Sequence, residues 1–205
     1  MSLPTTRQAY AFLAPLKSKS SIFIVGSTEV NLSFARFIFG CLEVMKTKAH
    51  IFDIDAFYGS NAMEVTKASS PDFLEDVSLS IPKSAFAIEY WFVDQLARGR
   101  EGDVVLVHDL NTVYHSIAIG DSRSAIKKLS LIMGLLSFLT RTKRQIALST
   151  LYERDGVVEN RLRRRSLNRL GDLTISVELQ SKALSFECTR GSAWKGNTFS
   201  VRPNP

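Results

Sequence analysis

Short runs of apolar residues alternate along this chain with longer segments in which apolar residues recur at helical spacing. The apolar runs are residues 22–25, 49–55, 104–108 and 145–150. The segments with helical spacing are residues 33–45, 84–98 and 121–141. Continuous apolar runs of this length are typical of buried strands, and the spacing of three to four is typical of helices. Their alternation predicts an α/β fold with a mostly parallel sheet flanked by helices.

The two ends of the chain depart from this alternation. Residues 172–179 and 183–188 form two apolar-polar runs around a turn at 180–182, and residues 197–201 follow. Strands without helices between them predict antiparallel strands added at one side of the sheet. The first twenty residues are mixed in character and predict a loosely attached arm or a short helix. We therefore expect an N-terminal arm over residues 1–20 and a single core domain over residues 21–205.

The composition excludes several classes of protein and points to a place in the cell. Of 205 residues, 45% are hydrophobic and 22% are charged, which is the balance of a globular domain, not of a coiled coil or a disordered tail. Two scattered cysteines, Cys41 and Cys188, suit a reducing compartment and show no metal-ligand spacing. No apolar stretch has the length of a signal peptide or a membrane span. We expect a cytoplasmic protein, associated with the nucleoid, with no bound metal and no membrane contact.

Residues 26–33 (Gly-Ser-Thr-Glu-Val-Asn-Leu-Ser) follow the first predicted strand and precede the first predicted helix. That position is where a phosphate-binding loop of the pattern G-x-x-x-x-G-K-[ST] is found. Gly26 and Ser33 match the pattern, whereas Asn31 replaces the second glycine and Leu32 replaces the lysine. Glycine lets backbone amides wrap around phosphates and lysine supplies their counter-charge, so both functions are lost. An ordinary turn between strand and helix is the alternative. Thr28 and Ser33 keep hydroxyl groups of the kind that bind a metal ion.

A second acidic motif ends the third apolar run. Residues 104–107 are apolar and are followed by His108 and Asp109. A buried strand that ends in an acid is typical of the Walker B motif, whose carboxylate handles magnesium. Many buried strands end in Asp for structural reasons, so the motif gains weight from its order after residues 26–33. For His108, a structural role is the favoured interpretation over acid-base chemistry.

Taken in order, these motifs resemble the core of the RecA/RadA recombinase superfamily, in particular its short archaeal RadA-paralog type, over residues 22–201. Residues 52–57 resemble the second strand of the family, where active members carry a catalytic glutamate; here the position is Phe57. The Phe-x-x-Ala polymerisation signature is absent after Phe12. The resemblance implies a RecA-like core that is not an enzyme: it has a degenerate nucleotide loop, no catalytic residues and no cofactor.

An arginine-rich segment covers residues 160–169 and contains five arginines and no acid. Its arginines are Arg161, Arg163, Arg164, Arg165 and Arg169, and Arg154 extends the charge. Guanidinium groups bind phosphate oxygens and stack on bases. A solvated loop and an interface for an acidic protein are the alternatives. The resemblance places residues 152–171 at the second DNA-facing loop of the family and residues 111–124 at the first, which would add Tyr114 and Arg123. Tyr114 either stacks on a base or packs in the core.

The function that these observations predict is that of a non-catalytic recombinase paralog. It would bind single-stranded or duplex DNA and assist a partner recombinase or paralog in homologous recombination and DNA repair, plausibly as a hetero-oligomer. Two alternatives stay open. The first is a regulatory or scaffolding subunit of the superfamily that acts through protein contacts without binding DNA. The second is an ATPase that receives its lysine from elsewhere.

Overall fold

A computed structural model describes residues 3–67, 69–121, 124–152, 171–181 and 183–201. Its strands form one sheet in the order β3-β2-β4-β5-β1-β6-β7-β8. The strands are β1 (Ser20–Val25), β2 (Ala49–Asp53), β3 (Val77–Ser80), β4 (Val104–His108), β5 (Ile146–Tyr152), β6 (Leu173–Gln180), β7 (Ala183–Arg190) and β8 (Thr198–Val201). Pairing is parallel from β3 across to β6 and antiparallel for β7 and β8. The α/β fold with antiparallel C-terminal strands is therefore confirmed.

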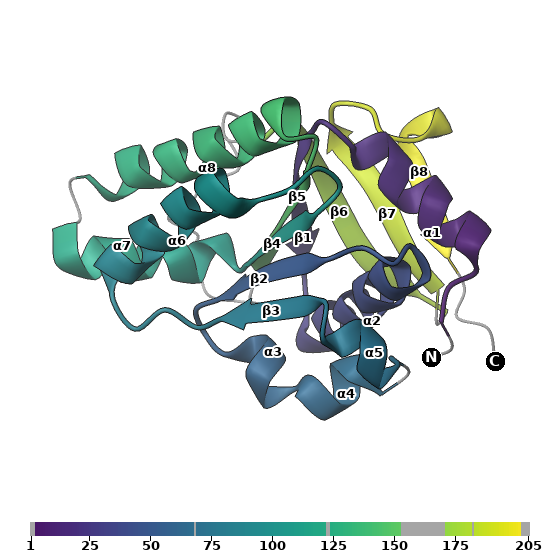
Figure 1. The fold of residues 1–205 in the computed structure, drawn as a ribbon. Helices are drawn as coiled ribbons and strands as arrows, with labels where there is room; N and C mark the ends of the chain where they lie inside the picture. Colours follow the sequence, from purple (N-terminus) through teal and green to yellow (C-terminus); the bar gives the residue numbers. More distant parts are fainter. Residues whose placement is uncertain (1–2, 68, 122–123, 153–170, 182, 202–205) are drawn as a thin grey trace.

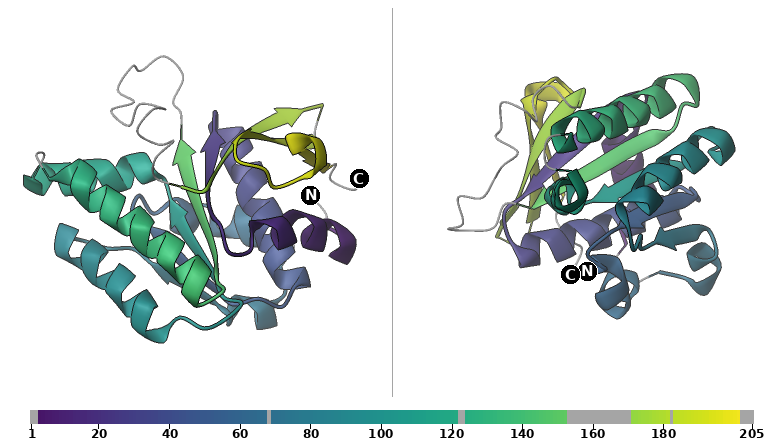
Figure 2. Two further views of the ribbon diagram at one scale, coloured as in Figure 1. Left: turned by 90° about the horizontal axis from the view of Figure 1, so that it is seen from above. Right: turned by 90° about the vertical axis from the view of Figure 1, so that its left-hand side faces the viewer.

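Helices cover both faces of the sheet (Figures 1 and 2). They are α1 (Thr6–Leu13), α2 (Thr28–Val44), α3 (Phe57–Ser60), α4 (Ala62–Thr66), α5 (Pro71–Leu74), α6 (Ala85–Arg98), α7 (Leu110–Asp121) and α8 (Ala125–Thr142), with short 3-10 turns at η1 (Ala14–Leu16) and η2 (Lys195–Asn197). Side chains alternate along β1, so that Phe23 packs in the core on the α1 and α2 side and Ile22 in the core beneath α6, α7 and α8. Two apolar cores thus fix the position of every parallel strand.

The N-terminal segment is part of the core. Thr5 caps α1 through a reciprocal capping box with Gln8. Phe12 is fully buried and stacks on Trp194, with ring centroids 5.6 Å apart and planes at 20°. The loosely attached arm predicted for residues 1–20 is thus wrong for α1, and the alternative of a short helix is correct. Trp194 is itself buried.

Two predicted segments have different secondary structure. The loop expected at residues 111–124 is largely helical, because α7 spans Leu110–Asp121. The long helix expected at residues 121–141 is α8, which begins at Ala125. No helix of the described ranges is both long enough and apolar enough to cross a bilayer.

Candidate functional site

The carboxyl ends of four neighbouring parallel strands, β2, β4, β5 and β1, meet at one edge of the sheet, where ligands bind in folds of this kind. Only Gly26 and Ser27 separate β1 from α2 at this edge. The Ser27 hydroxyl accepts a hydrogen bond from the backbone N–H of Val30 at 3.3 Å and so caps the helix. The residues compared with a phosphate-binding loop are therefore helical from Thr28 onward. The helix predicted to start at residue 33 starts five residues earlier because Ser27 is a strong cap.

The residues of the predicted degenerate nucleotide loop lie in different environments. Asn31 is 5% exposed, and its Oδ1 has no hydrogen-bond partner among the described residues. Leu32 is partly buried against the core, and Ser33 is also partly buried. Thr28 is exposed, and its hydroxyl shares a 2.9 Å hydrogen bond with the hydroxyl of Tyr152. The structure thus joins the start of α2 to the end of β5 instead of opening a space between them.

Asp109, the acid compared with a Walker B carboxylate, has a structural set of partners. It is 6% exposed and has a φ of +45°, in the left-handed region. Its Oδ1 accepts the backbone N–H groups of Asn111 at 3.1 Å and Tyr152 at 3.2 Å. Its Oδ2 accepts the hydroxyl of Thr112 at 2.6 Å. The carboxylate therefore caps α7 and ties that helix to β5.

Tyr114 does not present a stacking surface to a nucleic acid. It lies on α7, is 9% exposed, and belongs to the apolar core beneath α6, α7 and α8. The interpretation of Tyr114 as a base-stacking residue is corrected in favour of the core-packing alternative. The physical reason is that residues 110–121 form an amphipathic helix whose apolar face needs cover.

The predicted arginines lie outside the described residues. They are Arg123, Arg154, Arg161, Arg163, Arg164, Arg165 and Arg169. The described residues do fix where the arginine-rich segment is attached. Tyr152 ends β5 at the carboxyl edge of the sheet, and Asp172, whose backbone N–H donates to the carbonyl of Ser20 at 2.9 Å, lies beside the start of β1. Residues 153–170 therefore connect the carboxyl end of β5 to the amino end of β6.

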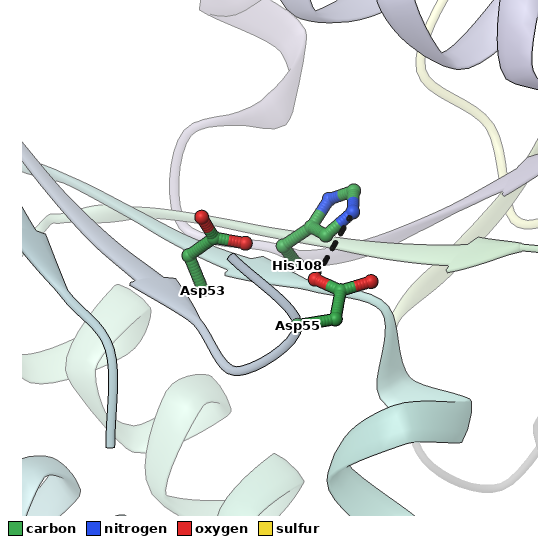
Figure 3. Close-up of side chains that lie close together, drawn as sticks. All are labelled: Asp53, Asp55 and His108. Atoms are coloured by element: carbon green, nitrogen blue, oxygen red, sulfur yellow. Dashed lines mark ion pairs between the residues drawn. The ribbon is translucent and has the colours of Figure 1, made fainter. Parts of the chain in front are cut away.

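A cluster of titratable side chains occupies the same edge, one strand further along. Asp53 ends β2 and His108 ends β4, and these two residues are paired in the register of the strands. Asp55 follows in the connection to α3, and its Oδ1 lies 3.7 Å from Nε2 of His108 (Figure 3). One ligand atom from each of the three residues lies within 4.8 Å of the others.

Asp53 is fully buried and holds the start of α3. Its Oδ1 accepts the backbone N–H of Phe57 at 3.0 Å, and its Oδ2 accepts those of Tyr58 at 2.8 Å and Gly59 at 3.4 Å. Burial raises the pKa of this carboxyl group to about 6; neighbouring Asp55 adds to the rise, and the backbone N–H groups of Tyr58 and Gly59 oppose it. Near neutral pH, Asp53 is therefore a carboxylate close to its titration point.

His108 is 1% exposed and is held on three sides. Its ring stacks on Phe57 with centroids 4.5 Å apart and meets Tyr58 edge-on at 5.2 Å. Its Nδ1 lies 3.2 Å from the hydroxyl of Thr150. Burial lowers the pKa of His108, although the charges of Asp55 and Asp109 oppose the shift. The imidazole is therefore neutral near pH 7, with Nε2 facing Asp55.

The chain is similar to known proteins in its fold but not in its sequence. No family model matches it, and no curated protein matches it. Among solved structures, the crystal structure of the RadB recombinase is similar with a TM-score of 0.64, covering 91% of this chain and 87% of that chain, at 12% sequence identity. The chain therefore has the RecA-like fold expected from the resemblance. At this identity the likeness concerns the fold alone.

Proposed function

We propose that this protein is a non-catalytic recombinase paralog that binds DNA and assists a partner recombinase in homologous recombination and repair. The observation that carries the proposal is the arginine-rich sequence of residues 160–169, which belongs to the connection that leaves the carboxyl edge of a RecA-like sheet at Tyr152. The similar RadB structure is that of a recombinase, which supports a role in recombination.

The geometry around β1 supports the non-catalytic part of the proposal. Phosphoryl transfer depends on a loop of backbone amides and a lysine that holds the outer phosphates. Here α2 begins at Thr28, and Leu32 packs against the core. The carboxylate of Asp109 accepts hydrogen bonds from the backbone N–H groups of Asn111 and Tyr152. Each part that would position ATP therefore serves the fold.

The charge of the chain supports DNA as the ligand. The sequence has 26 Lys and Arg against 20 Asp and Glu, and five of these cations lie within residues 160–169 without an acid among them. Many cations of the described residues are paired, such as Lys128 with Glu89 at 2.8 Å and Arg144 with Glu101 at 3.3 Å. A segment with no acid of its own is suited to the phosphate backbone of a nucleic acid, and such binding releases counterions.

The test is a titration of labelled single-stranded and duplex DNA at several salt concentrations, with and without ATP and magnesium. The triple variant Arg163→Ala, Arg164→Ala, Arg165→Ala should weaken binding by at least about tenfold. It should also reduce the slope of log affinity against log salt by about 2, because up to three phosphate contacts are lost. ATP should leave wild-type binding unchanged.

A matched variant removes three cations from the opposite end of the sheet. These cations are Arg98, Lys143 and Arg144, which lie near the amino ends of β4 and β5. Their replacement by alanine lowers the net charge by the same amount as the first triple variant does. This variant should keep wild-type affinity. Equal affinity of both triple variants and wild type contradicts DNA binding through residues 160–169 and favours a scaffolding subunit that binds protein.

A further inference from the structure

We propose that Asp53, Asp55 and His108 form a binding site for a divalent cation of the Zn²⁺ or Mn²⁺ class. Two carboxylates and one imidazole converge from the ends of two adjacent strands, with their ligand atoms within 4.8 Å of one another (Figure 3). This site goes beyond the proposed DNA-binding function, because it lies on β2 and β4 and uses none of the arginines.

The distances are close to those that a metal centre requires. Ligand atoms bound to one cation at about 2.0–2.1 Å lie about 3.3 Å apart in a tetrahedral arrangement. The Nε2 atom of His108 and Oδ1 of Asp55 are 3.7 Å apart. The side chain of Asp55 is 35% exposed and lies in the connection after β2. Its carboxylate therefore has room to move the remaining distance toward Nε2 of His108. Asp53 and His108 are held rigidly by the two strands.

The second layer of contacts is of the type found around metal ligands. The hydroxyl oxygen of Thr150, which also accepts the backbone N–H of Asp109, can accept a hydrogen bond from Nδ1–H of His108 at 3.2 Å. The lone pair of Nε2 is then directed to Asp55. Ligating histidines generally donate their other ring N–H in this way, and ligating carboxylates are themselves hydrogen-bonded. Asp53 meets the second condition, because backbone N–H groups of α3 donate to both of its oxygens. Oδ1 accepts one of these N–H groups, that of Phe57, and so keeps a second lone pair for a cation.

A buried hydroxyl beside the cluster provides an independent observation. Tyr58 is 3% exposed, and its hydroxyl has no hydrogen-bond partner among the described residues. Its ring lies edge-on against His108. Its backbone N–H donates to Oδ2 of Asp53 at 2.8 Å, so Tyr58 contacts two members of the cluster. A phenol that keeps its proton is a donor, and a water molecule on the cation is a suitable acceptor.

The donor set also selects among cations. Imidazole suits Zn²⁺ and other transition metals, whereas Mg²⁺ prefers an octahedral shell of oxygen ligands and water. Two neighbouring carboxylates disfavour each other's ionisation, and a divalent cation removes that repulsion. The site is therefore expected to prefer Zn²⁺ or Mn²⁺ to Mg²⁺.

The test is isothermal titration of the chelator-stripped full chain with Zn²⁺, Mn²⁺ and Mg²⁺, in the absence of nucleic acid. We expect one Zn²⁺ or Mn²⁺ per chain, weaker binding of Mg²⁺, and a rise in the melting temperature on addition of the preferred ion. Asp55→Asn, at a partly exposed position, should weaken binding by about tenfold or more without loss of the fold. His108→Gln should have the same effect, with its folding checked by thermal unfolding.

Two control variants test whether the cation binds at this site and not at another carboxylate or histidine of the protein. Asp72→Asn removes an exposed carboxylate from the first turn of α5, and His50→Gln removes the histidine that faces Asp103 at 3.3 Å. Both should bind the cation as wild type does. Absence of binding to wild type, or equal binding by wild type and Asp55→Asn, overturns the proposal. Loss of binding in His50→Gln overturns it as well. None of these results bears on DNA binding, which is measured separately.

Discussion

The backbone N–H of Tyr152 donates a 3.2 Å hydrogen bond to Oδ1 of Asp109. The bond joins the last residue of β5 to the residue that follows β4, and the same oxygen also accepts the backbone N–H of Asn111 at the start of α7. One carboxylate thus fixes the two strand ends and the helix from which the candidate functional edge is built. Because the connection that contains the arginine-rich segment starts immediately after Tyr152, Asp109 also sets the point from which that connection departs.

Replacement of Asp109 by alanine should therefore destabilise the fold. The change removes a helix cap, leaves buried N–H groups without an acceptor, and places a residue with a Cβ and no local hydrogen bond at a φ of +45°. Together these effects should lower the free energy of unfolding by about 2–4 kcal/mol. Urea unfolding followed by circular dichroism measures the change.

Asp109→Asn serves as the matched variant for this prediction. Asparagine keeps one acceptor oxygen and tolerates the left-handed region, so its cost should be clearly smaller. An unchanged free energy of unfolding in Asp109→Ala would show that the carboxylate has no structural role. That result would favour the alternative that Asp109 acts as a Walker B carboxylate.

Restoring the two missing residues of the phosphate-binding pattern should not restore ATP hydrolysis. In the double variant Asn31→Gly, Leu32→Lys, the sequence matches G-x-x-x-x-G-K-S, and we expect α2 still to begin at Thr28 because its cap, Ser27, is unchanged. The new lysine would replace a side chain that packs against the core, and no loop would surround the phosphates. Phosphate release and binding of a fluorescent ATP analogue should both stay at the wild-type level.

Glu29→Lys is the control for added positive charge, because it introduces a lysine at an exposed position of the first turn of the same helix. Turnover in the double variant but not in Glu29→Lys would mean that the helix start unwinds to admit nucleotide, contrary to the proposed non-catalytic role.

The stability of the protein should carry a pH signature of Asp53. The pKa of Asp53 is raised to about 6 in the folded state, above its ordinary value of 3.8, so the folded state binds the proton more tightly than the unfolded state. Its contribution to stability is therefore greatest below pH 4 and is lost as the pH rises to about 6. Relative to Asp53→Asn, wild type should lose about 2–3 kcal/mol between pH 4 and pH 7.

Urea unfolding at several pH values, with a chelator present, measures this difference between the two proteins. The titration of His108 opposes the slope but is common to both, so it largely cancels in the comparison. Asp55→Asn should show a shallower slope than wild type, because Asp55 contributes to the raised pKa. A difference between wild type and Asp53→Asn that stays constant with pH would contradict the assignment.

Much of the sheet was predictable from the sequence because its parallel strands are buried on both faces. The runs at residues 22–25 and 104–108 lie within β1 and β4, and Ser84 caps α6 as its position before an apolar helical segment predicts. The hairpin around residue 181 was predictable from two alternating runs that flank a short polar turn. In contrast, β3 is a short edge strand with partly exposed side chains, so it lacks the apolar signal of a central strand.

The candidate site was predictable only in part. The sequence places His108 at the end of the apolar run 104–108, and Asp53 and Asp55 at the end of the run 49–55. Their contact depends on β2 and β4 being neighbours, which is a property of strand order. The helix α7 was not predicted because residues 110–121 include Thr112, Val113, Ile117 and Ile119, whose branched side chains disfavour helices, and because the helix depends on its cap at Asp109. The structural roles of Asn31 and Leu32 were not predictable from the sequence. These residues replace the glycine and the lysine of the phosphate-binding pattern, but that mismatch does not indicate where the helix begins.

The stacking of Phe12 on Trp194 brings together two rings from opposite ends of the polypeptide. While the chain is being synthesised, the first helix emerges from the ribosome long before the indole that covers it. The apolar face of α1 therefore stays uncovered until almost the entire chain has been synthesised. The native state can form cooperatively only once β7 and β8 are available.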